Sequence, residues 1–120
     1  MASRIFVYGT LRKLGSASHL MQSAQLVEEN VKIAGIKIFD QGSYPVALDG
    51  FDLQAKVSGD IYMVDDALIK ILDRYEGDEY YRCKLSEVDT WIYLGKNRLQ
   101  VLKLPLIKSG DWLNYRCNYY

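Results

Sequence analysis

The chain has 120 residues, of which 49% are hydrophobic, and its 15 basic and 15 acidic residues give a formal charge of zero. This length suits one compact unit, so we expect a single domain over residues 1–120. The balanced charge, with no cluster of lysine or arginine, argues against a nucleic-acid partner.

Several common features of membrane and secreted proteins are missing from the sequence. The apolar runs Ile5–Tyr8 and Trp91–Leu94 are far shorter than the roughly 20 residues of a membrane-spanning helix. The run that follows Met1–Arg4 is also too short for a signal peptide. Cys83 and Cys117 lie far apart without a CxxC pair, which favours reduced thiols over a disulfide or a zinc site. We therefore expect a soluble, cytoplasmic protein that does not associate with membranes.

The first elements are a strand and a helix. Residues 4–8 are rich in β-branched and aromatic side chains, which predicts a short buried strand that ends at Gly9. Apolar residues then recur at helical spacing over residues 17–24, behind Ser16, a residue suited to cap a helix. A short amphipathic helix is expected there.

The middle of the chain shows the alternation of β-strands. The pattern that begins at Val31 slips by one residue at Ala34-Gly35, which indicates a β-bulge. Residues 42–45 and 48–50 have the composition of loops and turns. The clearest strand covers residues 54–63, and in it Gly59 marks a place where another group approaches closely.

A helix is predicted to follow, capped by Asp65 or Asp66 and ending at Glu76. Leu68, Ile71, Leu72 and Tyr75 have the spacing of a buried stripe. Glu76 continues this stripe, and Gly77 suits the cap just beyond the end of a helix.

Glu76 is therefore a candidate acid/base. Burial and the negative end of the helix dipole would both raise the pKa of its carboxyl toward neutrality, and such a group can exchange protons at neutral pH. The same pattern also fits a glutamate that turns into solvent where the helix frays.

The remaining sequence predicts more strands. Residues 80–86 alternate, residues 91–94 are apolar, and Leu102, Leu104 and Leu106 indicate a last apolar face, which Pro105 restricts to an edge. Residues 109–113 have the character of a turn that carries Trp112. Together these elements predict an α+β fold: a small, mixed, mostly antiparallel β-barrel of about five or six strands, flanked by two short helices.

Most familiar catalytic and binding motifs are absent from the sequence, and its only histidine, His19, does not build a metal site by itself. A Ser/His mechanism is disfavoured because neighbouring serines on a helix do not make a triad. One further candidate is the turn Tyr8–Arg12, whose consecutive backbone N–H groups are suited to bind a carboxylate or a phosphate. The same sequence also fits an ordinary turn at the end of a strand, with no ligand.

Several short motifs in a fixed order resemble the γ-glutamylcyclotransferase-like family, which includes plant AIG2-like proteins, γ-glutamylamine cyclotransferases and small bacterial proteins of the YtfP type. The motifs are Val7–Arg12, Tyr44-Pro45, Gly59-x-x-Tyr62, Leu72–Gly77 with Tyr80–Arg82, and Ser109–Trp112.

The resemblance implies a small barrel in which the first loop faces the glutamate across one pocket. It implies that Glu76 transfers protons, and that a loop holds the α-carboxylate of a γ-glutamyl group through Tyr8, Gly9, Thr10 and Leu11. Further residues are expected to line or brace the pocket: Tyr44, Tyr81, Arg82 and, outside any motif, Tyr115. Arg12 is either a substrate contact or part of a structural ion pair.

The implied reaction converts a γ-glutamyl amine or amino acid into 5-oxoproline and a free amine, a transferase chemistry that requires no metal or other cofactor. The expected partner is this small-molecule substrate, and the sequence does not indicate an oligomeric state. The alternative is a non-catalytic module on the same fold that binds a small anion or a protein.

Overall fold

The computed structural model describes residues 2–119, with side chains described as far as Arg116. Its strands are β1 (Ala2–Val7), β2 (Gln25–Ala34), β3 (Lys37–Asp40), β4 (Pro45–Leu48), β5 (Lys56–Asp65), β6 (Tyr80–Leu85) and β7 (Thr90–Gly95). Its helices are α1 (Asp66–Glu76), α2 (Arg98–Val101) and α3 (Trp112–Tyr119), with two short 3₁₀-helices, η1 (Ser18–Met21) and η2 (Gly77–Glu79).

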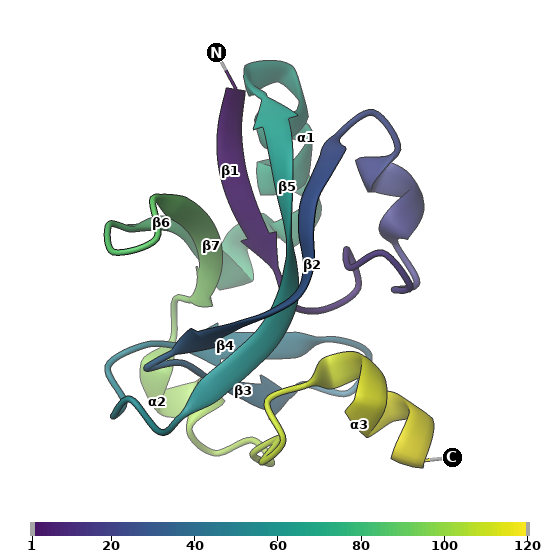
Figure 1. The fold of residues 1–120 in the computed structure, drawn as a ribbon. Helices are drawn as coiled ribbons and strands as arrows, with labels where there is room; N and C mark the ends of the chain where they lie inside the picture. The colour runs from purple at the N-terminus through teal and green to yellow at the C-terminus, as the bar shows by residue number, and fades with distance from the viewer. Residues whose placement is uncertain (1, 120) are drawn as a thin grey trace.

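The main sheet has five strands in the order β2-β5-β1-β7-β6. β1 runs parallel to β7, and the other neighbouring pairs are antiparallel. β3 and β4 form a separate antiparallel pair below this sheet (Figure 1). The α+β class is therefore confirmed, but the expected barrel is wrong: within residues 2–119, β2 and β6 are edges that do not pair with each other, so the sheet stays open.

β1 lies in the middle of the sheet with both faces covered, which explains the apolar run Ile5–Tyr8 at its end. Successive side chains of a strand point to opposite faces. Ile5 and Val7 join the part of the core that α1 covers, whereas Phe6 and Tyr8 join the part that contains Trp112. These four side chains are all buried. The turn that follows β1 therefore starts from a fixed position.

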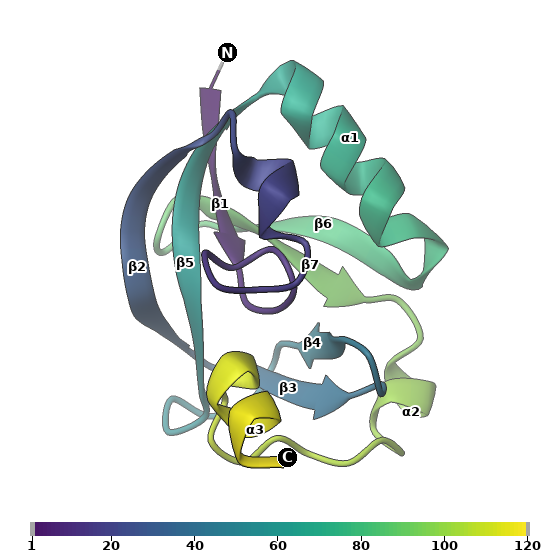
Figure 2. The same cartoon turned by 90° about the vertical axis from the view of Figure 1, so that its right-hand side faces the viewer.

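α1 buries Leu68 and Leu72 as predicted, but the rest of its buried stripe differs from the prediction. Leu68, Ile69 and Leu72 are buried, whereas Ile71 and Tyr75 are 49% and 44% exposed. The helix begins as expected, because the Asp65 side chain accepts a hydrogen bond from the Leu68 N–H at 2.8 Å. Figure 2 shows α1 running along the sheet toward the start of β6, and Glu76, one turn after Leu72, stays on the buried side.

The helix predicted after β1 is much shorter in the structure. Only residues 18–21 are helical, as η1, and no side chain caps them. The chain is tied instead to the turn before it, since the Ala17 N–H donates to the Thr10 carbonyl at 2.8 Å. A Cβ at Gly15 would collide with that same carbonyl. This close return leaves no room for a longer helix to begin at Ser16.

Two further predictions for the middle of the chain were wrong. Gly35 does not form a bulge but a turn with φ of +85° between β2 and β3. The irregular pairing of β2 lies earlier, between Leu26 and Val31. Residues 45–48 were not predicted as a strand, because Pro45 reads as a turn residue; in the structure they form β4, with Pro45 in its first position.

The last part of the chain also differs from its prediction. The apolar face expected at residues 102–106 is reduced to α2 and a single bridge between Phe39 and Leu106. The turn at residues 109–113 leads into α3, where the Asp111 side chain accepts from the Asn114 N–H at 3.2 Å.

No helix in residues 2–119 is long and apolar enough to span a membrane. Cys83 is a free thiol, and the side chain of Cys117 lies outside the described part.

Gly59 occupies the crowded position that its sequence context predicted. A Cβ there would collide with the Val7 carbonyl and the Phe6 ring. We expect Gly59→Ala to lower the free energy of unfolding by about 1–3 kcal/mol, measured by urea denaturation. Lys56→Ala, at an exposed position of the same strand, is the control and should change it by less than about 0.5 kcal/mol. Equal effects of the two substitutions would contradict the close packing of β5 on β1.

Candidate functional site

The turn after β1 is held in place by Tyr8. The Tyr8 hydroxyl donates to the Tyr93 carbonyl at 2.7 Å and accepts from the Ala47 N–H at 3.2 Å. It therefore connects the end of β1 to β7 and β4. The hydroxyl is fully engaged, so Tyr8 presents its ring to the pocket.

The backbone of this turn has the character of an anion site. The Arg12 N–H donates to the Gly9 carbonyl at 3.1 Å, which closes the turn. Within the described residues, the N–H groups of Thr10 and Leu11 donate to no protein acceptor. A Cβ at Gly9 would lie 2.7 Å from ring atoms of Pro45. Gly9 is thus required for the turn to approach β4 this closely.

Glu76 lies at the last position of α1, and the helix ends as predicted at Gly77. Gly77 has a φ of +73°, and its N–H donates to the Asp73 carbonyl. Burial, and then the nearby negative charge of Glu79, raise the pKa of Glu76 from 4.5 to about 7. The sequence predicted burial as a cause, but it did not predict the effect of Glu79.

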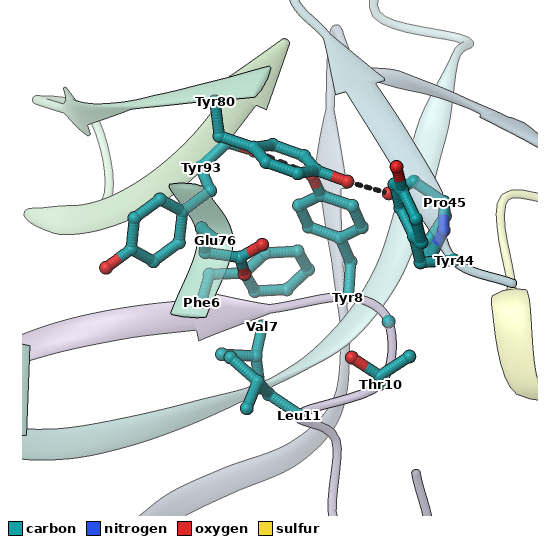
Figure 3. Close-up of a pocket in the computed structure, with 11 residues that line it drawn as sticks. Phe6, Val7, Tyr8, Thr10, Leu11, Tyr44, Pro45, Glu76, Tyr80 and Tyr93 are labelled. Atoms are coloured by element: carbon teal, nitrogen blue, oxygen red, sulfur yellow. Dashed lines mark hydrogen bonds between the residues drawn. The ribbon is translucent and has the colours of Figure 1, made fainter. Parts of the chain in front are cut away.

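Glu76 and the turn line one pocket. In Figure 3 the Glu76 carboxyl lies below the ring of Tyr80, with the ring of Tyr8 to its right and Thr10 at the lower right, and all four residues line the pocket. This inner pocket is narrow, with a cavity volume of about 20 Å³. It adjoins a wider outer hollow of about 370 Å³. Four residues line both spaces: Thr10, Tyr44, Glu76 and Tyr80.

Tyrosines frame the pocket and fix its walls. Tyr80 donates its hydroxyl to the Pro45 carbonyl at 2.8 Å, and Tyr44 donates to Glu79 Oε1 at 2.6 Å. The hydroxyls of Thr10 and Tyr75 are hydrogen-bonded to each other at 2.8 Å, which joins the turn to α1. Tyr44 therefore lies at the pocket as predicted. Four further residues that line the inner pocket or the outer hollow were not predicted from the sequence: Tyr75, Glu79, Tyr80 and Tyr93.

Arg82 lines neither the inner pocket nor the outer hollow, so of its two expected roles, lining or bracing the pocket, the structure supports bracing. Its guanidinium binds both oxygens of Asp73, at 3.0 and 3.3 Å, and lies over the Trp91 ring. Asp73 also accepts from the Tyr93 hydroxyl at 2.7 Å. Tyr93 lines the inner pocket, so Arg82 holds a wall of the pocket through Asp73 and Tyr93.

Tyr115 and Tyr81 are also outside the pocket, contrary to prediction. Tyr115 donates its hydroxyl to Asp40 Oδ2 at 2.6 Å and stacks on Trp112, so it fixes α3 against β3. Tyr81 is 43% exposed, because β6 turns Tyr80, rather than Tyr81, toward the interior.

Arg12 forms the structural ion pair that was one of its two expected roles. The side chain is 5% exposed. Its guanidinium lies 3.0 Å from Asp111 Oδ1 and 3.5 Å from Asp60 Oδ2. These contacts tie the turn to β5 and to the start of α3, away from the pocket.

This arrangement combines a carboxyl that titrates near neutral pH with backbone N–H groups suited to an anion. Such a carboxyl can accept a proton and return it at neutral pH. Within the described residues, no group of three or more His, Cys, Asp or Glu side chains could hold a metal ion.

Comparisons with known proteins agree with the motifs. Residues 5–114 match the family described as "Gamma-glutamyl cyclotransferase, AIG2-like". The chain is 37% identical over 115 residues to the "Gamma-glutamylcyclotransferase family protein YtfP" of Escherichia coli K12, covering 92% of this chain and 96% of that protein.

Solved structures share the fold. The solution NMR structure of ytfP from Escherichia coli is 34% identical, with a TM-score of 0.69, and the match covers 94% of this chain and 98% of that one. The crystal structure of c4763 from uropathogenic E. coli has a TM-score of 0.83 at 19% identity, with 100% and 99% covered, which supports the fold alone. With its ordered motifs, its matching fold and these relatives, the chain belongs to the AIG2-like γ-glutamylcyclotransferase family.

Proposed function

We propose that this protein is a γ-glutamyl cyclotransferase that releases 5-oxoproline and a free amine from a γ-glutamyl substrate. Glu76 is the general acid/base. The backbone of Gly9, Thr10 and Leu11 binds the substrate α-carboxylate, and the rings of Tyr8 and Tyr44 form walls. The observation that carries the proposal is the placement of Glu76, sheltered and near neutral in pKa, in the same pocket as this turn.

The substrate brings its own nucleophile. Its α-ammonium, with a reference pKa of about 8, must lose a proton before it can attack. Glu76, as a carboxylate, accepts this proton. The amine nitrogen then attacks the γ-carbonyl carbon, a new C–N bond closes the five-membered ring, and the bond to the leaving nitrogen breaks. Glu76 returns its proton to that nitrogen as the bond breaks. The ring nitrogen still carries two hydrogens at that point and passes one of them to the carboxylate of Glu76, which releases it to solvent, so the products are 5-oxoproline, a neutral amine and one proton.

The rest of the rate enhancement comes from aligning the amine of the substrate with its γ-carbonyl. A free γ-glutamyl chain has several rotatable bonds, and few of its conformers bring amine and carbonyl together. Binding of the α-carboxylate at Thr10 and Leu11, against the close wall of Tyr80, would hold the folded conformer. Intramolecular alignment of this kind is worth several kcal/mol.

Replacing the titrating group tests the role of Glu76. We expect Glu76→Gln, which preserves volume, to reduce 5-oxoproline release by at least about 100-fold because proton transfer is lost. Release is measured by mass spectrometry over a panel of γ-glutamyl amines and amino acids.

The matched control is Asp78→Asn, which removes a carboxylate two residues away that lines neither the inner pocket nor the outer hollow. It should retain activity. Undiminished release from Glu76→Gln would refute the assignment. Binding of unaltered γ-glutamyl compounds to the unsubstituted protein without any release would instead identify a non-catalytic binding module.

The pH dependence of kcat/KM follows from the pKa of Glu76. Below about pH 7 the carboxyl is protonated in the free protein and cannot accept the ammonium proton. We therefore expect kcat/KM to fall about tenfold per pH unit below this value. Glu79→Gln should move this fall in kcat/KM to lower pH, since the substitution removes a charge that raises the pKa of Glu76. If kcat/KM of the unsubstituted protein fell only below about pH 4.5, Glu76 would not be sheltered from water.

The same titration affects stability. Folded Glu76 retains its proton to higher pH than the unfolded chain, so its ionisation destabilises the fold as the pH rises from 4.5 to about 7. We expect the free energy of unfolding of Glu76→Gln, relative to that of the unsubstituted protein, to rise by up to about 3 kcal/mol between about pH 4.5 and pH 8. Urea denaturation at both ends of this range measures the gain. Asp78→Asn should show no such change, and a constant difference for Glu76→Gln would contradict the prediction.

A further inference from the structure

The proposed function does not use the motif Ser109–Trp112, which leads into α3. No residue of this segment lines the inner pocket or the outer hollow. Its side chains and those of the next turn of α3 nevertheless contact two segments that form walls of the pocket. The residues that make these contacts are Asp111, Tyr115 and Arg116.

Asp111 lies at a fixed place at the start of α3. On one side of it, the Ser58 N–H of β5 donates to the Gly110 carbonyl at 2.7 Å. On the other side, the Trp112 side chain is buried in the core. The backbone of Asp111 is therefore anchored to the main sheet before its side chain makes any contact.

Arg12 connects this anchored carboxylate to the turn after β1. Its Nη1 donates to Asp111 Oδ1 at 3.0 Å, whereas its Nε lies 3.5 Å from Asp60 Oδ2 and forms no hydrogen bond with any described residue. Asp111 therefore fixes the direction of the guanidinium. Arg12 directly follows Leu11, and its N–H closes the turn on the Gly9 carbonyl. Because the guanidinium is buried, loss of Asp111 would leave it without its best partner where water replaces that partner poorly.

The next turn of α3 holds a second wall, the loop of residues 40–44. The Tyr115 hydroxyl donates to Asp40 Oδ2 at 2.6 Å, and Arg116 Nη1 donates to the Gly42 carbonyl at 3.0 Å. This loop leads to Tyr44, which lines both the inner pocket and the outer hollow. One helix thus joins two walls that are distant in sequence.

We infer that α3 is a positioning element of the site, and that the Arg12–Asp111 pair sets the affinity of the turn for a carboxylate. The inference rests on the carboxylate-binding turn of the proposed function and adds that this binding is coupled to the docking of α3. Such coupling is reciprocal, so a bound carboxylate also holds α3 more firmly. Asp111 and Tyr115 act through other residues and do not touch the substrate.

5-Oxoproline is the probe for this coupling. It carries the carboxylate and is the product of every γ-glutamyl substrate, whichever amine departs. Its Kd is measured by NMR titration. We expect Asp111→Ser, which can still cap α3 but is one bond too short to reach Arg12, to raise this Kd about tenfold. Asp111→Asn keeps a neutral hydrogen bond to Arg12, which is about half as strong, and should raise the Kd about threefold.

The matched control for Asp111 is Glu29→Gln. Glu29 pairs with Lys13, the neighbour of Arg12, at 3.2 Å, but both side chains are more than half exposed. The Kd of this variant should stay within about twofold of the unsubstituted protein.

Tyr115→Phe tests the second wall and should raise the Kd of 5-oxoproline about threefold, because one hydrogen bond to the loop is lost. Tyr81→Phe removes the hydroxyl of a tyrosine outside both spaces and should leave the Kd unchanged. An unchanged Kd in Tyr115→Phe would overturn the role of the second wall.

Turnover separates positioning from a merely structural role. Asp111→Ser should raise KM for γ-glutamyl substrates about tenfold, keep kcat within about twofold, and leave the pH dependence of kcat unchanged, since Glu76 and Glu79 are intact. A merely structural role would reduce the folded fraction, and with it the apparent kcat, without changing KM.

Hydrogen exchange measures the reciprocal effect. The N–H groups of Asn114 and Tyr115 both donate to Asp111. Saturating 5-oxoproline should slow their exchange about tenfold in the unsubstituted protein, and by less than about twofold in Asp111→Ser.

The outcomes distinguish this inference from the proposed function. An unchanged Kd in Asp111→Ser, or exchange in α3 that does not respond to 5-oxoproline, would overturn the coupling and leave the cyclotransferase intact. If 5-oxoproline binds and its Kd depends on Asp111, but no γ-glutamyl compound is turned over, the cyclotransferase is refuted and the coupling stands. If 5-oxoproline does not bind to the unsubstituted protein, the coupling is refuted.

Discussion

The desolvation of one carboxyl is the constraint on which the site depends. Glu76 is polar and sits where water is largely excluded, a position that is unfavourable for a charged group. The position is enforced by Leu68 and Leu72, which are buried two turns and one turn before Glu76 and dock α1 on the sheet. Gly77 then lets the chain leave the helix at once. The packing of α1 thus offsets the cost of sheltering an acid at its end.

The second feature that shapes the site is a set of hydrogen bonds from tyrosine hydroxyls. Tyr8, Tyr80 and Tyr93 each place an apolar ring against the core and send a hydroxyl to a distant acceptor. Burial is the main cause that raises the pKa of all three groups, so they stay neutral donors. They connect β1, β4, β6 and β7 around the pocket without adding a charge beside Glu76. The chain has ten tyrosines, and the connections around the pocket are a structural role for these three.

The sequence was informative where a local signal coincided with a structural need. Gly77, Gly59 and the cap at Asp65 were predicted from single residues whose backbone or side-chain requirements are strict. The stripe of α1 was right at Leu68 and Leu72 but wrong at Ile71, because Ile69 and Ile71 are equally apolar and only the sheet decides which one is buried. Closure of the sheet depends on pairing between distant strands, which no local pattern encodes.

The candidate site was predictable to a similar degree. Glu76, the turn at Gly9 and Tyr44 were placed together through family motifs, and they do share a pocket. Arg82 belongs to the same motif but acts one layer away through Asp73, a distinction that requires coordinates. Tyr80 was missed because strand alternation has two possible phases, and the neighbouring Tyr81 was expected at the pocket instead.

The contact of Gly9 with Pro45 has an evolutionary consequence. With the Pro45 ring only 2.7 Å from the place of a Cβ on Gly9, the two positions are sterically interdependent, although they lie in different elements. A side chain at position 9 becomes tolerable only if position 45 first yields space, and losing the ring alone would open a gap beside the turn at Gly9. Drift at either position is therefore a two-step path through a less fit intermediate, and that barrier would preserve the pair.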